Sequence, residues 1–149
     1  MLLDNFLTIT TGSSIVGAIG TTTLTNVIDL GLPARNIGGG EPMVAVIDIV
    51  AGVFGVGAFV DFRIVTDAQD PMATDGTATI HCATGPIPRA SLATGTRIVI
   101  GLERIGFVNE RYLGVLVVVS GAATTVGTIA VSLHSGVQDT WRPYADAVN

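Results

Sequence analysis

One stretch of the chain alternates between apolar and polar residues more strictly than the rest. In segment 56–66, VGAFVDFRIVT, Val60, Phe62 and Ile64 fall on one side while Asp61 and Arg63 fall on the other. Successive side chains of a β-strand lie on opposite faces of the sheet. This period of two therefore predicts a strand with one buried face.

Further segments are rich in Val, Ile and Thr and are separated by clusters of Gly, Pro, Asn and Asp, which favours strands joined by turns. They cover 22–30, 43–50, 77–82, 96–102, 110–120 and 126–134. No sustained helical spacing is present. The pattern predicts an all-β fold, an antiparallel jelly roll or β-sandwich of about eight strands. One domain spans 1–149, with an extended N-terminal arm at 1–20 and a C-terminal tail at 135–149.

The alternation also predicts which side chains face the core. Outside segment 56–66 they are Met43, Ala45, Ile47, Ile49, Ala78, Ile80, Cys82, Ile98, Ile100 and Leu102. Segments 112–119 and 44–50 break the rule, because both of their faces are largely apolar. A sandwich strand normally has one wet face, so these dry outer faces predict a cover, either a subunit interface or the chain's own arm and tail.

Chemically active residue types are present without a catalytic or metal-binding pattern. His81 and His134 lie in different strands, each without a second metal-type residue on the same face, and both are expected to be ordinary surface histidines. His81 and Cys82 are adjacent in one strand and are expected to point to opposite faces, which argues against a catalytic dyad. Cys82 is the only cysteine, so no intrachain disulfide is possible, and it is expected to be a small buried strand residue.

Three loops invite a functional interpretation that their details do not support. The glycines of NIGGGEP (36–42) lack the GK[ST] ending of a phosphate loop. Asp67, Asp70 and Asp75 lack the EF-hand spacing and predict a solvated acidic loop. The charges of ERIGFVNERY (103–112) predict surface or interface ion pairs. We therefore predict a protein that is not an enzyme and that has no cofactor and no metal.

Composition narrows the class of partner. Charged residues make up 13% of the chain, there is no lysine, and the net charge is −5. So few charges suit a surface that other subunits cover. Scattered arginines on an acidic chain argue against nucleic acid. The charge-free stretch 112–138 contains the turn-rich SGAATTVGT, so no membrane span is predicted.

The C-terminal tail concentrates the side chains that most often anchor protein interfaces. The only tryptophan, Trp141, stands beside Arg142, Pro143 and Tyr144, and Trp, Arg and Tyr are the residue types enriched among binding anchors. Two interpretations stay open: the tail folds back over its own sandwich, or it docks on a neighbouring subunit.

Four segments, in order, resemble the capsid cement (decoration) proteins of tailed bacteriophages. They are NVIDLG (26–31), ARNIGGGEPM (34–43), ERYL (110–113) and QDTWRPYADA (138–147). The resemblance implies a jelly-roll protein on the outer surface of an icosahedral head, assembled in the host cytoplasm. It would bind the major capsid protein, bridge neighbouring subunits and stabilise the mature shell. It would also pair with itself as a homodimer at two-fold positions.

On this interpretation the chain acts by binding alone. The expected partner contacts are Leu2, Leu3, Phe6, Arg111, Tyr112, Trp141, Arg142 and Tyr144. Arginine forks suit bidentate pairing with a partner's carboxylates. Leu2, Leu3 and Phe6 have the alternative of completing the core, and Tyr112 that of stacking inside it.

Two other classes of function compete with this one. A receptor-binding or head-fibre domain of a virion would more often be trimeric and would expose a glycan or protein site. A small jelly-roll hydrolase or isomerase would need a metal or a shared acid–base pocket.

Overall fold

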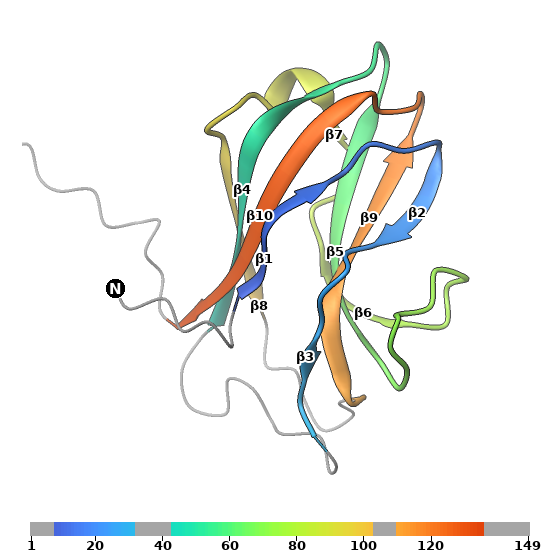
Figure 1. The fold of residues 1–149 in the computed structure, drawn as a ribbon, viewed down its shortest axis with the longest axis vertical. Coiled ribbons are helices and arrows are strands. Elements are labelled where there is room, and N and C mark those ends of the chain that lie inside the picture. Colours follow the sequence, from blue (N-terminus) through green and yellow to red (C-terminus); the bar gives the residue numbers. More distant parts are fainter. Residues whose placement is uncertain (1–7, 32–42, 103–109, 136–149) are drawn as a thin grey trace, which may run out of the picture.

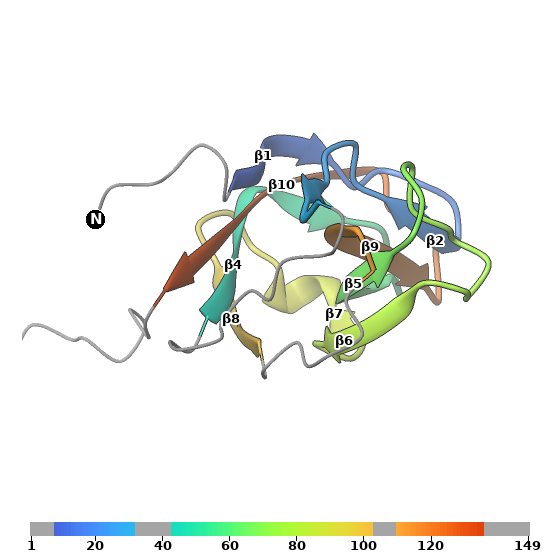
Figure 2. The same cartoon turned by 90° about the horizontal axis from the view of Figure 1, so that it is seen from below.

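The computed structural model describes residues 8–31, 43–102 and 110–135, which form two antiparallel sheets packed face to face (Figures 1 and 2). The first sheet runs β1 (Thr8–Ser14), β10 (Val126–Ser135), β4 (Met43–Phe54) and β8 (Arg97–Leu102). The second runs β2 (Gly20–Thr23), β9 (Tyr112–Ser120), β5 (Phe59–Asp67) and β6 (Thr79–Ala83). Two short strands extend the second sheet: β3 (Ile28–Asp29) pairs with β9 and β7 (Ile87–Pro88) pairs with β5. One turn of 3-10 helix, η2 (Arg89–Ser91), follows β7.

The strand order is that of a jelly roll. When the eight longer strands are numbered along the chain, the first sheet reads 1-8-3-6 and the second reads 2-7-4-5. Strands far apart in sequence therefore lie side by side, as in two interlocked Greek keys. The predicted all-β sandwich is confirmed.

The residues on the apolar side of the alternation identified in the sequence form part of the core. Val60, Phe62 and Ile64 of β5 are fully buried, and Ala45, Ile47 and Ile49 of β4 face them from the other sheet within one cluster. Asp61 and Arg63 lie on the outer face of the second sheet. Burial of one face of each sheet against the other provides the main stabilisation of such a fold.

Three predicted boundaries change. The arm predicted for 1–20 contains β1, which pairs along β10, so Thr8–Ser14 belong to the first sheet. The strand predicted for 22–30 is divided into β2 and β3, both on β9. The loop predicted for 83–95 contains β7 and η2.

The predicted inward face of β6 is wrong at two positions. Ile64 pairs with Cys82 but Val65 pairs with Ile80, so the register shifts by one residue at His81. A bulge of this kind reverses the side on which later residues fall. Cys82 accordingly packs against the core, whereas Ile80 is exposed and Ala78 joins a second cluster with Val65.

Part of the dry outer face of β9 is covered by another segment of the chain itself. Met72, from the loop between β5 and β6, packs with Val65 and Leu116 on the outer face of the second sheet. A Cβ atom at Gly114 would lie 2.8 Å from the Met72 sulfur, so the glycine makes room for this cover. On β4, Val44 and Val46 are buried beside their register partners His134 and Ser132.

Candidate functional site

Arg111 and Tyr112 are the two predicted contact residues within the described part of the chain. They lie where β9 begins, next to β3, at the lower end of the molecule in Figure 1. Asp29 is the register partner of Tyr112, and the Leu30 amide donates a 2.8 Å hydrogen bond to the Arg111 carbonyl. Segments 26–31 and 110–113, about eighty residues apart, thus form one unit, which we call the motif end.

The Arg111 side chain closes this unit with an ion pair. Its Nε donates to Asp29 Oδ1 at 3.0 Å and its Nη2 donates to Oδ2 at 2.8 Å, while the Gly31 amide donates to Oδ1 at 2.8 Å. These bonds stabilise the charged carboxylate, and the Arg111 guanidinium is the main reason that the pKa of Asp29 falls to about 2. The bidentate pairing predicted for a partner's carboxylate therefore forms within the chain, to Asp29.

Part of the Tyr112 side chain makes contacts within the chain. Its ring lies 5.0 Å from the Arg111 guanidinium carbon, in cation–π range. It also packs against the cluster around Met72 and Leu116. Tyr112 therefore packs within the chain, but against the outer-face cluster and not in the core between the sheets. Contact of either residue with a partner stays a prediction.

Glu110, the residue before this pair, carries an unsatisfied atom. Its Oε2 is buried and has no hydrogen-bond partner among the residues that the structure describes. Its charge acts on His81, whose Nε2 lies 2.8 Å from the hydroxyl of the fully buried Thr66. Burial lowers the pKa of His81 and the Glu110 charge opposes that shift.

The prediction of surface histidines is wrong for His134 and holds only in part for His81. His134 is buried on the first sheet, where Ser132 lies 2.7 Å from its Nε2, and burial lowers its pKa. His81 is half-buried. Within the described ranges, no three His, Cys, Asp or Glu side chains lie close enough to hold a metal ion. Cys82 is half-buried, and burial raises the pKa of its thiol.

The acidic loop is also less solvated than predicted. Asp67 is buried, and its two oxygens accept hydrogen bonds from the Gln69 amide at 3.2 Å and the Ala73 amide at 2.7 Å. Asp75 accepts from both the amide and the hydroxyl of Thr77. These carboxylates shape the loop that places Met72.

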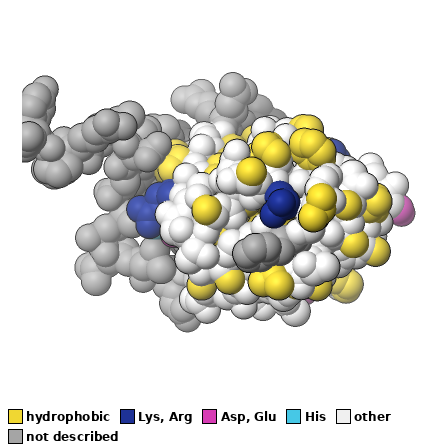
Figure 3. Space-filling view, turned by 90° about the horizontal axis from the view of Figure 1, so that it is seen from above, with side chains coloured by type: hydrophobic (Ala, Val, Ile, Leu, Met, Phe, Trp, Pro, Cys, Tyr) yellow, Lys and Arg dark blue, Asp and Glu magenta, His cyan; other side chains and the backbone are white. Residues whose placement is uncertain are grey.

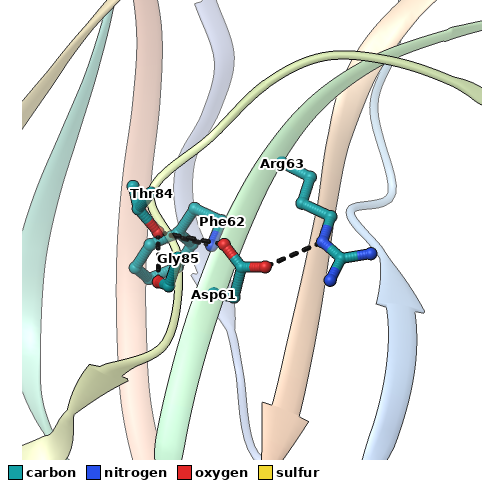
Figure 4. A network of polar contacts seen from close by, with 5 residues as sticks. All are labelled: Asp61, Phe62, Arg63, Thr84 and Gly85. Carbon is teal, nitrogen blue, oxygen red and sulfur yellow. Dashed lines mark hydrogen bonds and ion pairs between the residues drawn. The ribbon is translucent and has the colours of Figure 1, made fainter.

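A polar network that the sequence reasoning did not single out lies on the outer face of β5 (Figure 4). Arg63 Nε donates to Asp61 Oδ2 at 2.8 Å. The Thr84 hydroxyl accepts from the Phe62 amide at 3.0 Å, and its one hydrogen can reach Gly85 O at 2.9 Å or Asp61 Oδ1 at 3.2 Å. The sequence signal that could have identified this network is Arg63, a charged residue on the polar side of the strand with the strictest alternation.

The upper end of the sandwich is apolar. It is built from segment 15–19 and the turns 55–58 and 121–125, and we call it the turn end. Its exposed large apolar side chains are Val16, Ile19, Val56, Phe59 and Val126. Figure 3 looks onto this end and shows apolar side chains spread across it among polar atoms, with a basic side chain near the middle and an acidic one at the margin. Scattered single valines in turns carried no periodic signal from which this surface could be predicted.

The other predicted contact residues lie outside the described residues. They are Leu2, Leu3, Phe6, Trp141, Arg142 and Tyr144. The segments 34–42 and 138–147 of the resemblance lie there too, so their roles stay predictions. In the described part of the chain, no helix has the length and apolar character to cross a membrane.

Comparison with known proteins supplies the family. A search among curated proteins finds no match. The model of the Bbp16 family matches residues 11–133, a range that takes in both sheets and the motif end. The chain therefore belongs to the Bbp16 family.

Proposed function

We propose that this protein is a capsid cement (decoration) protein of a tailed bacteriophage. It binds the outer surface of the icosahedral head, bridges neighbouring major capsid protein subunits and stabilises the mature shell. It acts as a homodimer at two-fold positions, after assembly in the host cytoplasm. Binding is its whole activity, and it uses no cofactor.

The observation that carries the proposal is the convergence at the motif end. Two of the four segments that resemble cement proteins meet as one hydrogen-bonded unit, closed by Arg111 and Asp29. A chance likeness of short segments gives no reason for them to meet in space. Membership of the Bbp16 family supports a phage-related protein.

The surface chemistry fits a protein that works by contact. The turn end exposes five large apolar side chains, and an exposed apolar patch favours burial against another protein. Each contact of a cement protein can be modest because many symmetric copies act on one shell.

The experiment is co-sedimentation of the purified chain with mature shells from its own source after removal of this protein. We expect saturable binding at a fixed ratio to the major capsid protein and a higher melting temperature of the loaded shell. Trp141→Ala, in the predicted contact tail, is expected to load less well than the parent. A folded sample that does not bind shells would refute the proposal, and glycan binding by a trimer would indicate the head-fibre class instead.

A further inference from the structure

We propose that the outer face of the second sheet, centred on Arg63 and Phe59, docks on the shell, and that Arg63 binds a carboxylate of the major capsid protein. The inference rests on the proposed function and adds to it the surface and the chemistry of the contact. It involves none of the residues predicted as contacts from the sequence.

The first argument is that Arg63 has an open fork. Arg111 and Arg97 each use Nε and Nη2 together on one carboxylate, of Asp29 and Asp48 respectively. Arg63 uses Nε alone, on Asp61. Among the described residues, neither Nη atom of Arg63 has a hydrogen-bond partner. A guanidinium has five N–H donors, so the two Nη groups remain available to another molecule.

The second argument is that contacts with the sheet beneath it hold the Arg63 guanidinium in place. Asp61 is only 7% exposed, and its second oxygen lies 3.2 Å from the Thr84 hydroxyl. Thr84 is itself fixed to the strand, since its amide donates to the Phe62 carbonyl and its hydroxyl accepts from the Phe62 amide, both at 3.0 Å. Figure 4 shows the Arg63 side chain extending away from this anchor on the side of β9. A side chain already fixed loses little entropy on binding.

The third argument is the surroundings of Arg63. Its register partner on β9 is Leu116, and Asp61 pairs with Val118. On β2, Thr23 and Thr21 pair with these two residues in turn. Cross-strand partners share a face of the sheet. Leu116 is buried under Met72, whereas Val118, Thr21 and Thr23 are partly exposed and uncharged, so on the side of β9 and β2 the described neighbours of the Asp61–Arg63 pair carry no charge.

Phe59 completes the surface. It stands on the same face of β5, four residues before Arg63 and therefore about 13 Å away along the strand. Its side chain is 40% exposed. Arginine and aromatic side chains surrounded by uncharged groups are the usual anchors of protein interfaces.

The shape of the open fork identifies the ligand group. Two parallel N–H donors at the tip of a guanidinium match the two oxygens of a carboxylate, which would share the Arg63 charge with Asp61. A backbone carbonyl offers only one oxygen. Uncharged neighbours make such a pair stronger than it would be in water. The expected partner is therefore an Asp or Glu side chain of the shell protein.

The test measures shell binding of the full chain and four variants over a range of salt concentrations. Arg63→Gln is expected to weaken binding at least tenfold and to reduce its salt dependence, while Arg63→Lys keeps the charge and recovers only part of the affinity. Because Arg63→Gln leaves Asp61 unpaired, the double variant Asp61→Asn with Arg63→Gln removes both charges and is expected to bind as weakly. Arg97→Gln removes a more exposed ion pair from the other sheet and is the control for loss of an arginine charge, expected to bind like the parent.

The outcomes separate the two proposals. If the parent does not bind shells, the proposed function fails and this inference fails with it. If the parent binds and Arg63→Gln binds equally well, the function stands and the inference is overturned. Equal losses in Arg63→Gln and Arg97→Gln would also overturn it, and so would a loss that leaves the salt dependence unchanged.

Discussion

The turn end and the motif end of this sandwich are held together by different kinds of contact. At the turn end the contacts are made mostly by backbone: the Gly17 amide donates to the Thr124 carbonyl at 3.2 Å, and the Thr124 hydroxyl donates to the Ile15 carbonyl at 2.6 Å. At the motif end an exposed ion pair between Asp29 and Arg111 joins two segments. The turn end therefore has an apolar surface over tightly packed turns, whereas the motif end is charged and exposed to water.

The comparison shows that an exposed side chain can belong to a tightly packed segment. Val56 is 86% exposed, yet the turn that carries it is in close contact with the neighbouring turn, since a Cβ at Gly121 would lie 2.3 Å from the Gly57 carbonyl oxygen. The motif end has the most specific side-chain geometry, but exposed ion pairs contribute little to stability. We therefore expect substitutions at the close contacts beneath the turn end to affect folding, and substitutions of exposed side chains at either end to change stability little.

The largest effect is expected for Gly121→Ala. Gly121 has φ +77°, which costs an L-residue about 1–2 kcal/mol, and the contact with Gly57 adds about 1–3 kcal/mol of overpacking. Urea unfolding should show a loss of about 2–5 kcal/mol. Gly57→Ala is the matched control, because Gly57 has φ +80° with no atom near the new Cβ. Equal losses in the two variants would mean that the turns do not pack as closely as described.

The next largest effect is expected for Met72→Ala, beneath the loop that covers the outer face of β9. Met72 is 3% exposed and packs with Val65 and Leu116. Its truncation should cost about 2–3 kcal/mol in urea unfolding, at the low end for buried methionine because a loop can relax into the space. Val56→Ala, at the exposed turn end, should change the unfolding free energy very little. A larger loss in Val56→Ala than in Met72→Ala would reverse the comparison.

The sequence predicts the sheets well because the signal is local. Alternation over Val60, Phe62 and Ile64 places the core, and the turn clusters between strands limit their lengths. From these the all-β sandwich follows, and with the resemblance, its jelly-roll order. The predictions fail where a contact between distant segments determines which way a side chain points. At His81, for example, a bulge in the pairing with β5 turns Ile80 outward.

The candidate site was only partly predictable for the same reason. Arg111 could be selected by residue type, but its partner Asp29 is eighty residues away, and no spacing rule joins them. The sequence places Asp61 and Arg63 on an outer face of a sheet. It does not show that Arg63 uses only its Nε atom in the ion pair with Asp61. That detail depends on Thr84, which reaches Asp61 from a different strand connection.

A moderate, pH-dependent effect is expected from His81. Its pKa lies below the ordinary value because burial disfavours the charged ring, so the stability that it contributes is complete above about pH 6.5 and is lost as the pH falls through its lowered pKa. His134, whose pKa is also lowered, adds a loss of the same sign. Urea unfolding at pH 7.5 and pH 5.5 should show a decrease for the parent and a smaller decrease for His81→Gln. The same decrease in both would remove His81 as a cause.

The smallest effect on stability is expected at the motif end. Asp29→Asn removes the charge of the pair but keeps the shape of the side chain, and since both partners are exposed, the melting temperature at pH 7 should hardly move. The pH dependence is more informative. The pKa of Asp29 is about 2 in the folded chain and 3.8 in the unfolded chain, so its contribution is complete above about pH 5 and is lost as the pH falls toward 2. The difference between parent and Asp29→Asn should therefore be constant from pH 7 to about pH 5, a range in which histidines titrate, and should shrink below it. A difference that already shrinks at pH 6 would mean that the pair responds to His81 or His134, and the ion pair could then no longer be treated as independent of the histidines.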